Sequence, residues 1–509
     1  MEEADYVIVG GGTAALVVAC RLSENPETRI VVLERGEDTS SDARVQDPLV
    51  YESLMGSEMD WNLKGAPQAG LNGREFNQAA GKALGGSSVI NGCIFLPPAA
   101  AAFNAWESLG NPGWNWETLA PCFQRAYTLH PRTGGPQSNT AGPIQVSYPV
   151  PTERADTTLL DAWKQAFEEH GYGYADELVS EGATIGTRPY TATIDPVSGH
   201  RSSAANGYGA IIASRANVRI VTEVQIEAQG TVLFKPTKEV IMAAGVFNNP
   251  QILELSGIGD PARLQTLGIS PLVHLPGVGE NLTNHAMSVL SAPVKAHADI
   301  QDIAPGMKAN AFIHLAPMDM QEILDRAREA PDHAAIAGIL NGPNEASACI
   351  HFAIYPGNLA IIGIFPSFPF SRGSVHIQSA DPASSPQIDP KYLNHPSDLD
   401  SMVRHVQHLQ EILHSARLQP FVDAPPPQDR EALAQLVREA MAIPTAHACG
   451  TTAMLPRERG GVVASDLKVY GVSNVRVVDA SVFPVISQAN PISTVYTVAE
   501  RAADLIRAN

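Results

Sequence analysis

The stretch "DYVIVGGGTAALVVACRLSE", residues 5–24, decides the fold. Residues 6–9 are an apolar run that predicts a buried strand, and the apolar positions within 16–22 predict a helix after the glycines. A second apolar run, "RIVVLERG" at 29–36, ends in the acid Glu34. A strand, a glycine turn, a helix and an acid at the end of the next strand are together typical of a dinucleotide-binding βαβ unit. The sequence therefore predicts an α/β fold that begins with a Rossmann-like domain.

Four residues of this unit have predicted roles. Gly10 permits the tight turn, Gly12 lets the backbone approach a pyrophosphate, and Ala15 keeps the helix close to the sheet. Glu34 is placed to bind ribose hydroxyls. The alternative, a plain glycine turn, leaves the flanking strand, helix and acid unexplained. The unit does not distinguish NAD from FAD.

Composition narrows the class of partner. At 509 residues the chain has room for about two to four domain-sized units, and its 44% hydrophobic and 17% charged residues are typical of a globular protein. The formal charge of −19 argues against nucleic acid and against an anionic membrane surface, because both need clustered Lys and Arg. We therefore expect a small-molecule ligand.

Cysteine usage and the apolar segments exclude several other classes. The odd and sparse set of five cysteines provides neither a disulfide framework nor paired zinc ligands, so we expect no metal. The start "MEEADYVIVGGG" lacks the regions of a signal peptide, which favours a cytoplasmic or intracellular protein, although a secreted protein trimmed of its signal would begin the same way. The apolar region 349–370 is interrupted by Pro, Gly and Asn and predicts buried strands, not a membrane helix.

Four further motifs follow in order along the chain. They are "GKALGGSSVINGCIFLPP" (81–98), "AAGVFNNPQILELSGIG" (243–259), "PGVGENLTNH" (276–285) and "NVRVVDASVFPVISQANPISTVYTVAERAADLI" (474–506). The first is a glycine and serine cluster whose backbone donors could surround a phosphate or a ring edge. Taken together with the N-terminal unit, the set resembles the glucose-methanol-choline (GMC) family of FAD-dependent oxidoreductases, and within it members similar to aryl-alcohol oxidases.

The resemblance implies two domains and one cofactor. A Rossmann-like FAD-binding domain would be assembled from the discontinuous segments 1–147, 204–290 and 440–509. A substrate-binding domain with a mixed or antiparallel sheet and covering helices would use 148–203 and 291–439. Some family members attach FAD through a histidine in the first signature, and "GGSSVIN" contains none, so the resemblance implies noncovalent FAD.

The resemblance also implies a set of cofactor-binding residues, which is Gly10, Gly12, Thr13, Ala14, Ala15, Glu34, Arg35, Gly85, Gly86, Ser87, Asn91, Gly92, Cys93, Ile94, Val224, Ala244, Asp479, Ala480, Asn490 and Pro491. An acid beside a pyrophosphate is unfavourable unless it receives backbone or water hydrogen bonds, which is the arrangement we expect for Asp479. The chain departs from the family pattern at four positions that carry no catalytic group, namely Ala15, Ala80, Asn249 and Asn284.

The stretch "PTAHACGTTAML", residues 444–455, contains the candidate base. A lone histidine in an apolar stretch is usually a core residue, and a metal site would need ligands that the sequence does not supply around His447 and Cys449. The resemblance implies a third role, because the family has a catalytic histidine in an "H-x-x-G-T" segment and a second His or Asn before a proline. These positions are His447 and Asn490. Asn490 cannot take a proton at neutral pH, so His447 is the expected base.

The resemblance implies oxidation of an alcohol, with hydride transfer to flavin N5 and O₂ as acceptor, giving an aldehyde and H₂O₂. We expect a neutral primary aryl or allylic alcohol, for which Phe365, Phe368 and Phe370 could form an aromatic slot, although core packing explains at least two of them. The alternatives are a dehydrogenase that uses a quinone or another acceptor, a lyase of the hydroxynitrile type, and a non-catalytic flavin protein. The expected assembly is a monomer or homodimer.

Overall fold

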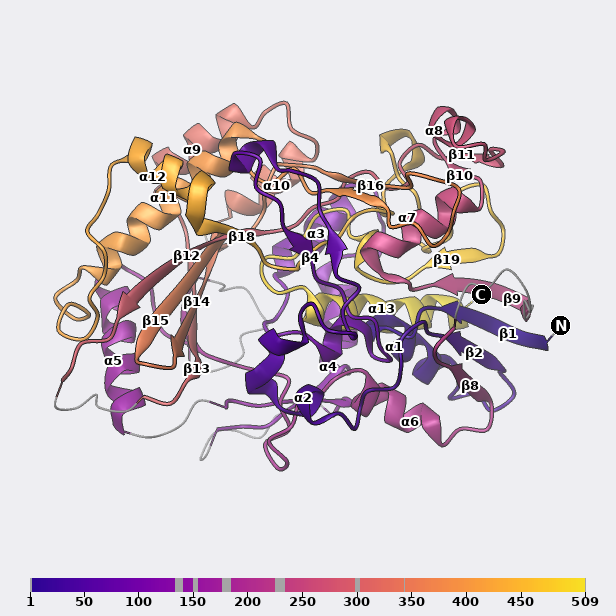
Figure 1. Cartoon of the computed structure of the whole chain (residues 1–509), viewed down its shortest axis with the longest axis horizontal. Coiled ribbons are helices and arrows are strands. Elements are labelled where there is room, and N and C mark those ends of the chain that lie inside the picture. Colours follow the sequence, from indigo (N-terminus) through magenta and orange to yellow (C-terminus); the bar gives the residue numbers. More distant parts are fainter. Residues whose placement is uncertain are drawn as a thin grey trace.

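The computed structural model describes residues 2–132, 141–149, 154–175, 185–224, 234–297, 303–342 and 344–508. Its first sheet has five parallel strands in the order β19-β9-β1-β2-β8. The strands are β1 (Glu2–Val9), β2 (Ile30–Leu33), β8 (Val218–Val221), β9 (Phe234–Met242) and β19 (Val475–Val477). Three distant parts of the chain therefore build one sheet, which lies at the right-hand end of Figure 1.

Helix α1 (Thr13–Leu22) joins β1 to β2 and is buried at every residue except Arg21. The C-terminal helix α13 (Ile492–Arg507) packs along α1, and α4 (Trp116–Gln124) packs on α13. Glu500 of α13 has a fully buried side chain that pairs with Arg21 at 2.9 Å and with Arg125 at 2.6 Å. These ion pairs connect the C-terminal helix α13 to the N-terminal helix α1 and to the residue that follows α4.

The second sheet has six strands in the order β18-β12-β15-β14-β13-β7, and all of its pairs are antiparallel. The strands are β7 (Gly186–Pro189), β12 (Ala286–Pro293), β13 (Gly306–Ile313), β14 (Ala348–Tyr355), β15 (Leu359–Pro366) and β18 (Ala442–Pro444). The sheet lies at the opposite end of the molecule in Figure 1.

The two faces of the second sheet have different neighbours. Helices α5 (Arg154–Glu169) and α11 (Pro396–Leu413) cover one face, with α9 (Pro317–Arg326) and α12 (Arg430–Leu436) packed on α11. Along β14, Ile350 and Phe352 belong to the core on this side. Cys349 belongs to a smaller cluster with Phe365 and Ala489, which is directed towards the first domain. Because successive side chains of a strand point to opposite faces of the sheet, β14 directs one set of side chains at the covering helices and the other at the domain junction.

The remaining elements are short or peripheral. They are α2 (Ala43–Gln46), α3 (Ala100–Ser108), α6 (Ala210–Ala213), α7 (Gly245–Leu255), α8 (Pro261–Thr266), α10 (His333–Leu340), β3 (Leu63–Lys64), β4 (Asn77–Gln78), β5 (Tyr127–Leu129), β6 (Ile144–Val146), β10 (Ile258–Gly259), β11 (Val273–His274), β16 (Ser374–His376), β17 (Gln387–Asp389) and the short helices η1 (Pro48–Leu54), η2 (Ala69–Leu71), η3 (Gly86–Val89), η4 (Ala205–Gly209), η5 (Val437–Met441), η6 (Arg457–Arg459) and η7 (Ala480–Val482). In the part of the chain that the structure describes, no helix combines the length and apolar character needed to cross a membrane.

The predicted fold class is confirmed, with a Rossmann-like domain of discontinuous segments and a second domain built on an antiparallel sheet. Two expected segment borders differ from the strand assignment by a few residues. The segments 204–290 and 440–509 were expected in the first domain, but β12 starts at Ala286 and pairs with β18 in the second sheet. A border inside a paired strand has no sequence signal, because the pairing is non-local.

Candidate active site

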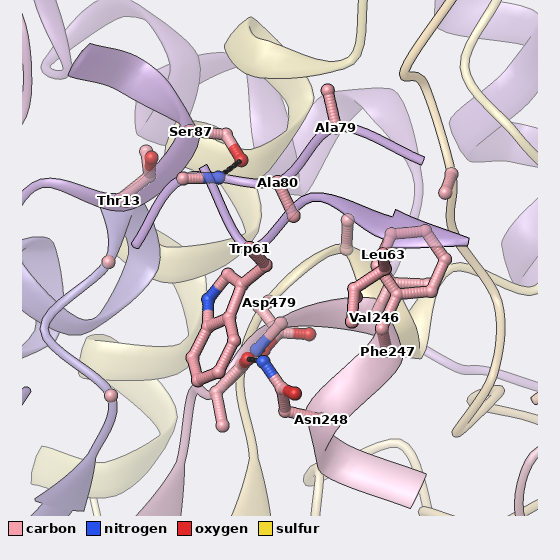
Figure 2. Close-up of a pocket in the computed structure, with 18 of the residues that line it drawn as sticks. Thr13, Trp61, Leu63, Ala79, Ala80, Ser87, Val246, Phe247, Asn248 and Asp479 are labelled. Atoms are coloured by element: carbon pink, nitrogen blue, oxygen red, sulfur yellow. Dashed lines mark hydrogen bonds between the residues drawn. The ribbon is translucent and has the colours of Figure 1, made fainter. Parts of the chain in front are cut away.

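A cavity of about 530 Å³ lies where the two domains meet. Its wall combines the turn before α1, the end of β2, the segment 79–94, the first part of α7, residues 445–448 and the segment that precedes α13. Figure 2 shows part of it, with Trp61 and Asn248 facing the same space and Leu63, Val246 and Phe247 grouped at one side. Its volume is in the range of cavities that enclose cofactors and drug-sized ligands.

The N-terminus of α1 faces this cavity. Gly12 begins the helix without a side-chain cap, there is no acid in the first turn, and Thr13 and Ala14 line the wall. Gly10 has φ +101°, and a Cβ on it would lie 2.4 Å from the carbonyl oxygen of Ala243. Only glycine fits there, so the chain can turn sharply enough to direct the helix end at the cavity. An uncapped helix N-terminus of this kind favours an anion such as a pyrophosphate.

Glu34 lies beside this turn and is held by backbone donors. Its two carboxylate oxygens accept hydrogen bonds from the N–H groups of Gly11 and Gly36, each at 2.7 Å. Burial raises the pKa of the Glu34 carboxyl, and these backbone donors oppose the rise. Each oxygen retains a lone pair for a ligand hydroxyl. Arg35 and Val224 line the same part of the cavity, and the N–H of Val224 donates to the carbonyl of Glu34.

Asp479 receives the hydrogen bonds that its position demands. One carboxylate oxygen accepts from the N–H of Gly245 at 2.9 Å and from the Asn249 amide at 2.7 Å. The other accepts from the N–H of Ser481 at 2.8 Å and from its hydroxyl at 2.5 Å. Burial raises the pKa of the Asp479 carboxyl, and these donors counteract it. Asn249, one of the departures from the family pattern, thus has a structural function beside the cavity.

Three residues expected to contact the cofactor do not line the cavity. Ala15 is fully buried inside α1, where it packs the helix on the sheet. A Cβ on Gly85 would lie 2.8 Å from the side chain of Val89 and 3.0 Å from that of Ala205, and Gly85 does not line the cavity. Cys93 lies in a cluster with Tyr190 on the far side of its loop, because its backbone is left-handed (φ 59°). The other expected cofactor-binding residues and both expected catalytic residues line this one cavity.

His447 follows β18 and is held by contacts with four residues. Its backbone N–H donates to Asn284 Oδ1 at 2.9 Å, which gives a function to another departure from the family pattern. Its Nδ1 lies 3.0 Å from Nδ1 of His285, and its Nε2 lies 3.0 Å from Nδ2 of Asn490. The ring of Phe365 packs edge-on, with centroids 5.6 Å apart. The side chain is therefore fixed in orientation.

The protonation state of His447 follows from the hydrogen bonds. Nε2 of His285 lies 2.9 Å from the carbonyl oxygen of Ser367, which can only accept, so this nitrogen carries the proton. Burial lowers the pKa of His285 to about 4, so its Nδ1 is an acceptor, and His447 Nδ1 must donate to it. Burial, followed by the two neighbouring histidines, also lowers the pKa of His447 well below its usual value. Nε2 of His447 is therefore unprotonated, and its lone pair accepts a hydrogen bond from the Asn490 amide.

His285 and His351 were not predicted as site residues. His351 lies on β14, opposite Asn310 of β13, and its Nδ1 donates to Asn310 Oδ1 at 2.8 Å. Burial lowers its pKa to about 4, so it is also neutral. Phe365, which was considered for an aromatic slot, lies among all three histidine rings. Like Phe368 and Phe370, it is a buried core residue that does not line the cavity. Only the strand register brings these residues together.

Trp61 is another part of the wall that sequence reasoning missed. Its ring has the guanidinium of Arg35 at 5.4 Å and the ammonium of Lys82 at 5.8 Å from the centroid. The three side chains come from separate loops, so no local pattern indicates that they meet. Among the described residues, no group of three or more His, Cys, Asp or Glu side chains could hold a metal ion.

Comparison with known proteins agrees with this geometry. Two family models described as GMC oxidoreductase match residues 4–229 and 224–287, and 369–499. The chain belongs to the GMC oxidoreductase family. The GMC family protein Mala s 12 of Malassezia sympodialis is 31% identical, over 99% of this chain and 92% of that protein.

Solved structures also resemble this GMC protein over its whole length. An FAD-dependent oxidoreductase from Chaetomium thermophilum is 26% identical with a TM-score of 0.89, and the match covers 99% of both chains. A fungal aryl-alcohol oxidase is 27% identical with a TM-score of 0.84, again over 99% of both chains. The family makes this chain an FAD-dependent oxidoreductase that acts on CH–OH groups.

The cavity fits FAD. The uncapped start of α1 suits the pyrophosphate, and Glu34 suits the ribose of the adenosine. Gly86 has φ +56°, and a Cβ on it would lie 2.8 Å from Cα of Gly12. The absence of side chains at Gly12 and Gly86 lets these two loops lie close together, and both glycines line the cavity. His447 and Asn490 mark the end at which the ring system would react.

Proposed function

We propose that this protein oxidises a neutral primary alcohol to the aldehyde, with His447 as the base and O₂ as the final electron acceptor. The observation that supports this most directly is the unprotonated Nε2 of His447, which lines the cavity beside the Asn490 amide. The groups that contact His447 are uncharged at neutral pH, which favours a neutral substrate. The similarity to an aryl-alcohol oxidase supports an aryl alcohol.

The oxidation removes a proton from the hydroxyl and a hydride from the adjacent carbon. The substrate hydroxyl donates to His447 Nε2 in place of the Asn490 amide, which then donates to the substrate oxygen. His447 takes the proton as the C–H bond breaks, and such a base contributes roughly 10²- to 10⁴-fold in rate. FAD, when bound, would supply the hydride acceptor, and the two electrons with two protons would then convert O₂ to H₂O₂.

His285 keeps His447 in the reactive tautomer. Its Nδ1 accepts the Nδ1 proton of His447, because its own proton is held on Nε2 by the Ser367 carbonyl. The lone pair of His447 is therefore directed at the cavity before substrate binds. Noncovalent FAD is part of the proposal, since His447 is the one histidine among the described residues of the cavity wall, and the proposal requires it as the base.

The test is anaerobic flavin reduction by the His447→Ala variant. We expect the variant to retain the yellow cofactor and to reduce FAD about 10²- to 10⁴-fold more slowly with an aryl alcohol. The control is His405→Gln, which changes a buried, hydrogen-bonded histidine of α11 that does not line the cavity. Near-normal reduction in His447→Ala would refute the base assignment.

Two measurements separate the neighbouring activities. An alcohol that leaves the wild-type flavin oxidised while being converted would indicate a lyase. Oxygen pulsed onto the reduced protein in a stopped-flow instrument tests the acceptor, because an oxidase reoxidises rapidly and forms H₂O₂. Slow reoxidation by O₂ together with rapid reoxidation by a quinone would identify a dehydrogenase.

A further inference from the structure

Arg201 is a buried cation with an unusual set of partners. It precedes the short helix η4 and is 1% exposed. Its Nε donates to the carbonyl of Val45 at 2.9 Å, and its Nη1 donates to the carbonyl of Asn91 at 2.5 Å and to Asn91 Oδ1 at 2.8 Å. Its Nη2 is buried without a partner, and no carboxylate of the described residues pairs with it.

These contacts determine how Asn91 faces the cavity. Asn91 Oδ1 accepts both from Arg201 and from the backbone N–H of Cys93 at 3.0 Å. The oxygen side of the amide is therefore turned towards the protein. Asn91 lines the cavity, so its Nδ2 is the amide atom available to a ligand there. Nδ2 can only donate, which matches a phosphate oxygen or a ring carbonyl.

The charge of Arg201 also has to be compensated. A buried guanidinium without an acid is in general unfavourable, because burial removes its hydration without supplying a counter-charge. Its titratable neighbours Cys93, Tyr190 and Tyr496 do not help, since burial raises the pKa of each and keeps them neutral. The loop that Arg201 holds separates it from the cavity, whose wall includes the positive end of α1. An anionic ligand in the cavity, beyond Asn91, would compensate this charge.

We propose that Arg201 is a positioning residue for FAD. It sets the Asn91 amide with Nδ2 towards the cofactor, and it places a positive charge behind residues 91–93 that favours an anionic ligand. The proposal rests on the FAD dependence of the family and is independent of which alcohol is oxidised. The backbone N–H of Cys93 is the second donor to Asn91 Oδ1, beside Arg201. This hydrogen bond is consistent with the orientation of Cys93 away from the cavity.

The Asn91→Asp variant separates cofactor positioning from a purely structural role. A carboxylate at position 91 gives Arg201 an acid partner at the distance of the present 2.8 Å contact, cancels its charge and removes the Nδ2 donor. We expect the apoprotein to unfold at a higher temperature than the wild type, while the dissociation constant for FAD rises about 100-fold. Asn91→Ala removes the donor but leaves the charge, so its dissociation constant should rise only about tenfold.

Variants of Arg201 complete the test. Arg201→Met should weaken FAD binding at least as much as Asn91→Ala, and Arg201→Lys should recover part of the loss because it keeps the charge but cannot bond several oxygens as a guanidinium does. The control is Arg215→Met, since Arg215 also bonds a backbone carbonyl and a side-chain oxygen, those of Cys20 and Ser23, but does not line the cavity. It should lower stability without changing the dissociation constant.

The results that would overturn the proposal concern binding, measured by titrating apoprotein with FAD. If Asn91→Asp binds FAD as tightly as Asn91→Ala, Arg201 contributes no charge to the site. If Arg201→Met folds with a lower unfolding temperature but an unchanged dissociation constant, Arg201 is structural only. Loss of alcohol oxidation with normal FAD binding would instead count against the proposed function and leave this inference standing.

Discussion

At the scale of single residues, His447 is a base because its surroundings keep it neutral. Burial, more than the nearby histidines, lowers its pKa well below 6.5. The unprotonated imidazole is the reactive form, so acid stops the reaction only when the pH falls below the pKa that His447 has in the folded protein. We expect the rate of anaerobic flavin reduction to stay constant from neutral pH down through about 6.5 and to fall only in more acidic solution. A rate that already falls with an apparent pKa of about 6.5 would contradict this.

His285 sets the tautomer of His447, and replacing His285 should change the rate of flavin reduction. His285→Phe keeps a ring against Phe365 but leaves the Nδ1–H of His447 without its acceptor. The proton can then move to Nε2, where it blocks the base. We expect flavin reduction to slow, by less than the roughly 10²- to 10⁴-fold loss in His447→Ala, with the FAD absorption spectrum unchanged. Unaltered reduction would show that the Asn490 contact alone is sufficient.

At the scale of elements, an ion-pair cluster fastens β16 to α7. Nδ1 of His376 lies 2.8 Å from Glu254 and its Nε2 lies 3.1 Å from Glu280. Burial alone would lower the pKa of His376, but the two carboxylates raise it overall. A raised folded pKa gives stability that is full below the unfolded pKa of about 6.5 and is lost as the pH rises through the folded value.

The cluster can be tested by unfolding His376→Gln and wild-type protein across pH. The difference in free energy of unfolding between them should be larger at about pH 6 than at about pH 9, because only the protonated imidazole forms two ion pairs. A difference that is equal at both pH values would show that His376 contributes packing and neutral hydrogen bonds only.

The elements also show which parts of the site the sequence could predict. The turn before α1 is local, so spacing alone was enough to group Gly10, Gly12 and Glu34, and all three line the cavity. Cys93 does not line the cavity, since its backbone is left-handed and its side chain packs elsewhere, and a single non-glycine residue in the sequence gives no sign of such a conformation. His285 was missed because it reaches His447 only through the pairing of β12 with β18, which depends on contacts 160 residues apart in sequence.

At the scale of the whole molecule, the cavity is where the two domains and the distant segments of the chain meet. Its wall runs from Val9 in β1 to Val495 in α13, and it includes the segments 382–386 and 445–448. A cofactor in this cavity would contact several segments that are far apart in the sequence and would link them to one another. Occupancy of the cavity should therefore contribute to the stability of the assembled fold.

Removal of FAD should lower the stability of the whole protein in a concentration-dependent way. A ligand that binds only the folded state stabilises it by about 2.7 kcal/mol at a concentration 100 times its dissociation constant. We expect the unfolding temperature of apoprotein to rise continuously with added FAD. Riboflavin, which lacks the pyrophosphate and adenosine, should stabilise less at equal concentration, because it cannot use the start of α1 or Glu34. Equal stabilisation by both would place the binding energy in the ring system alone, and an unfolding temperature independent of FAD would contradict a cofactor held between the domains.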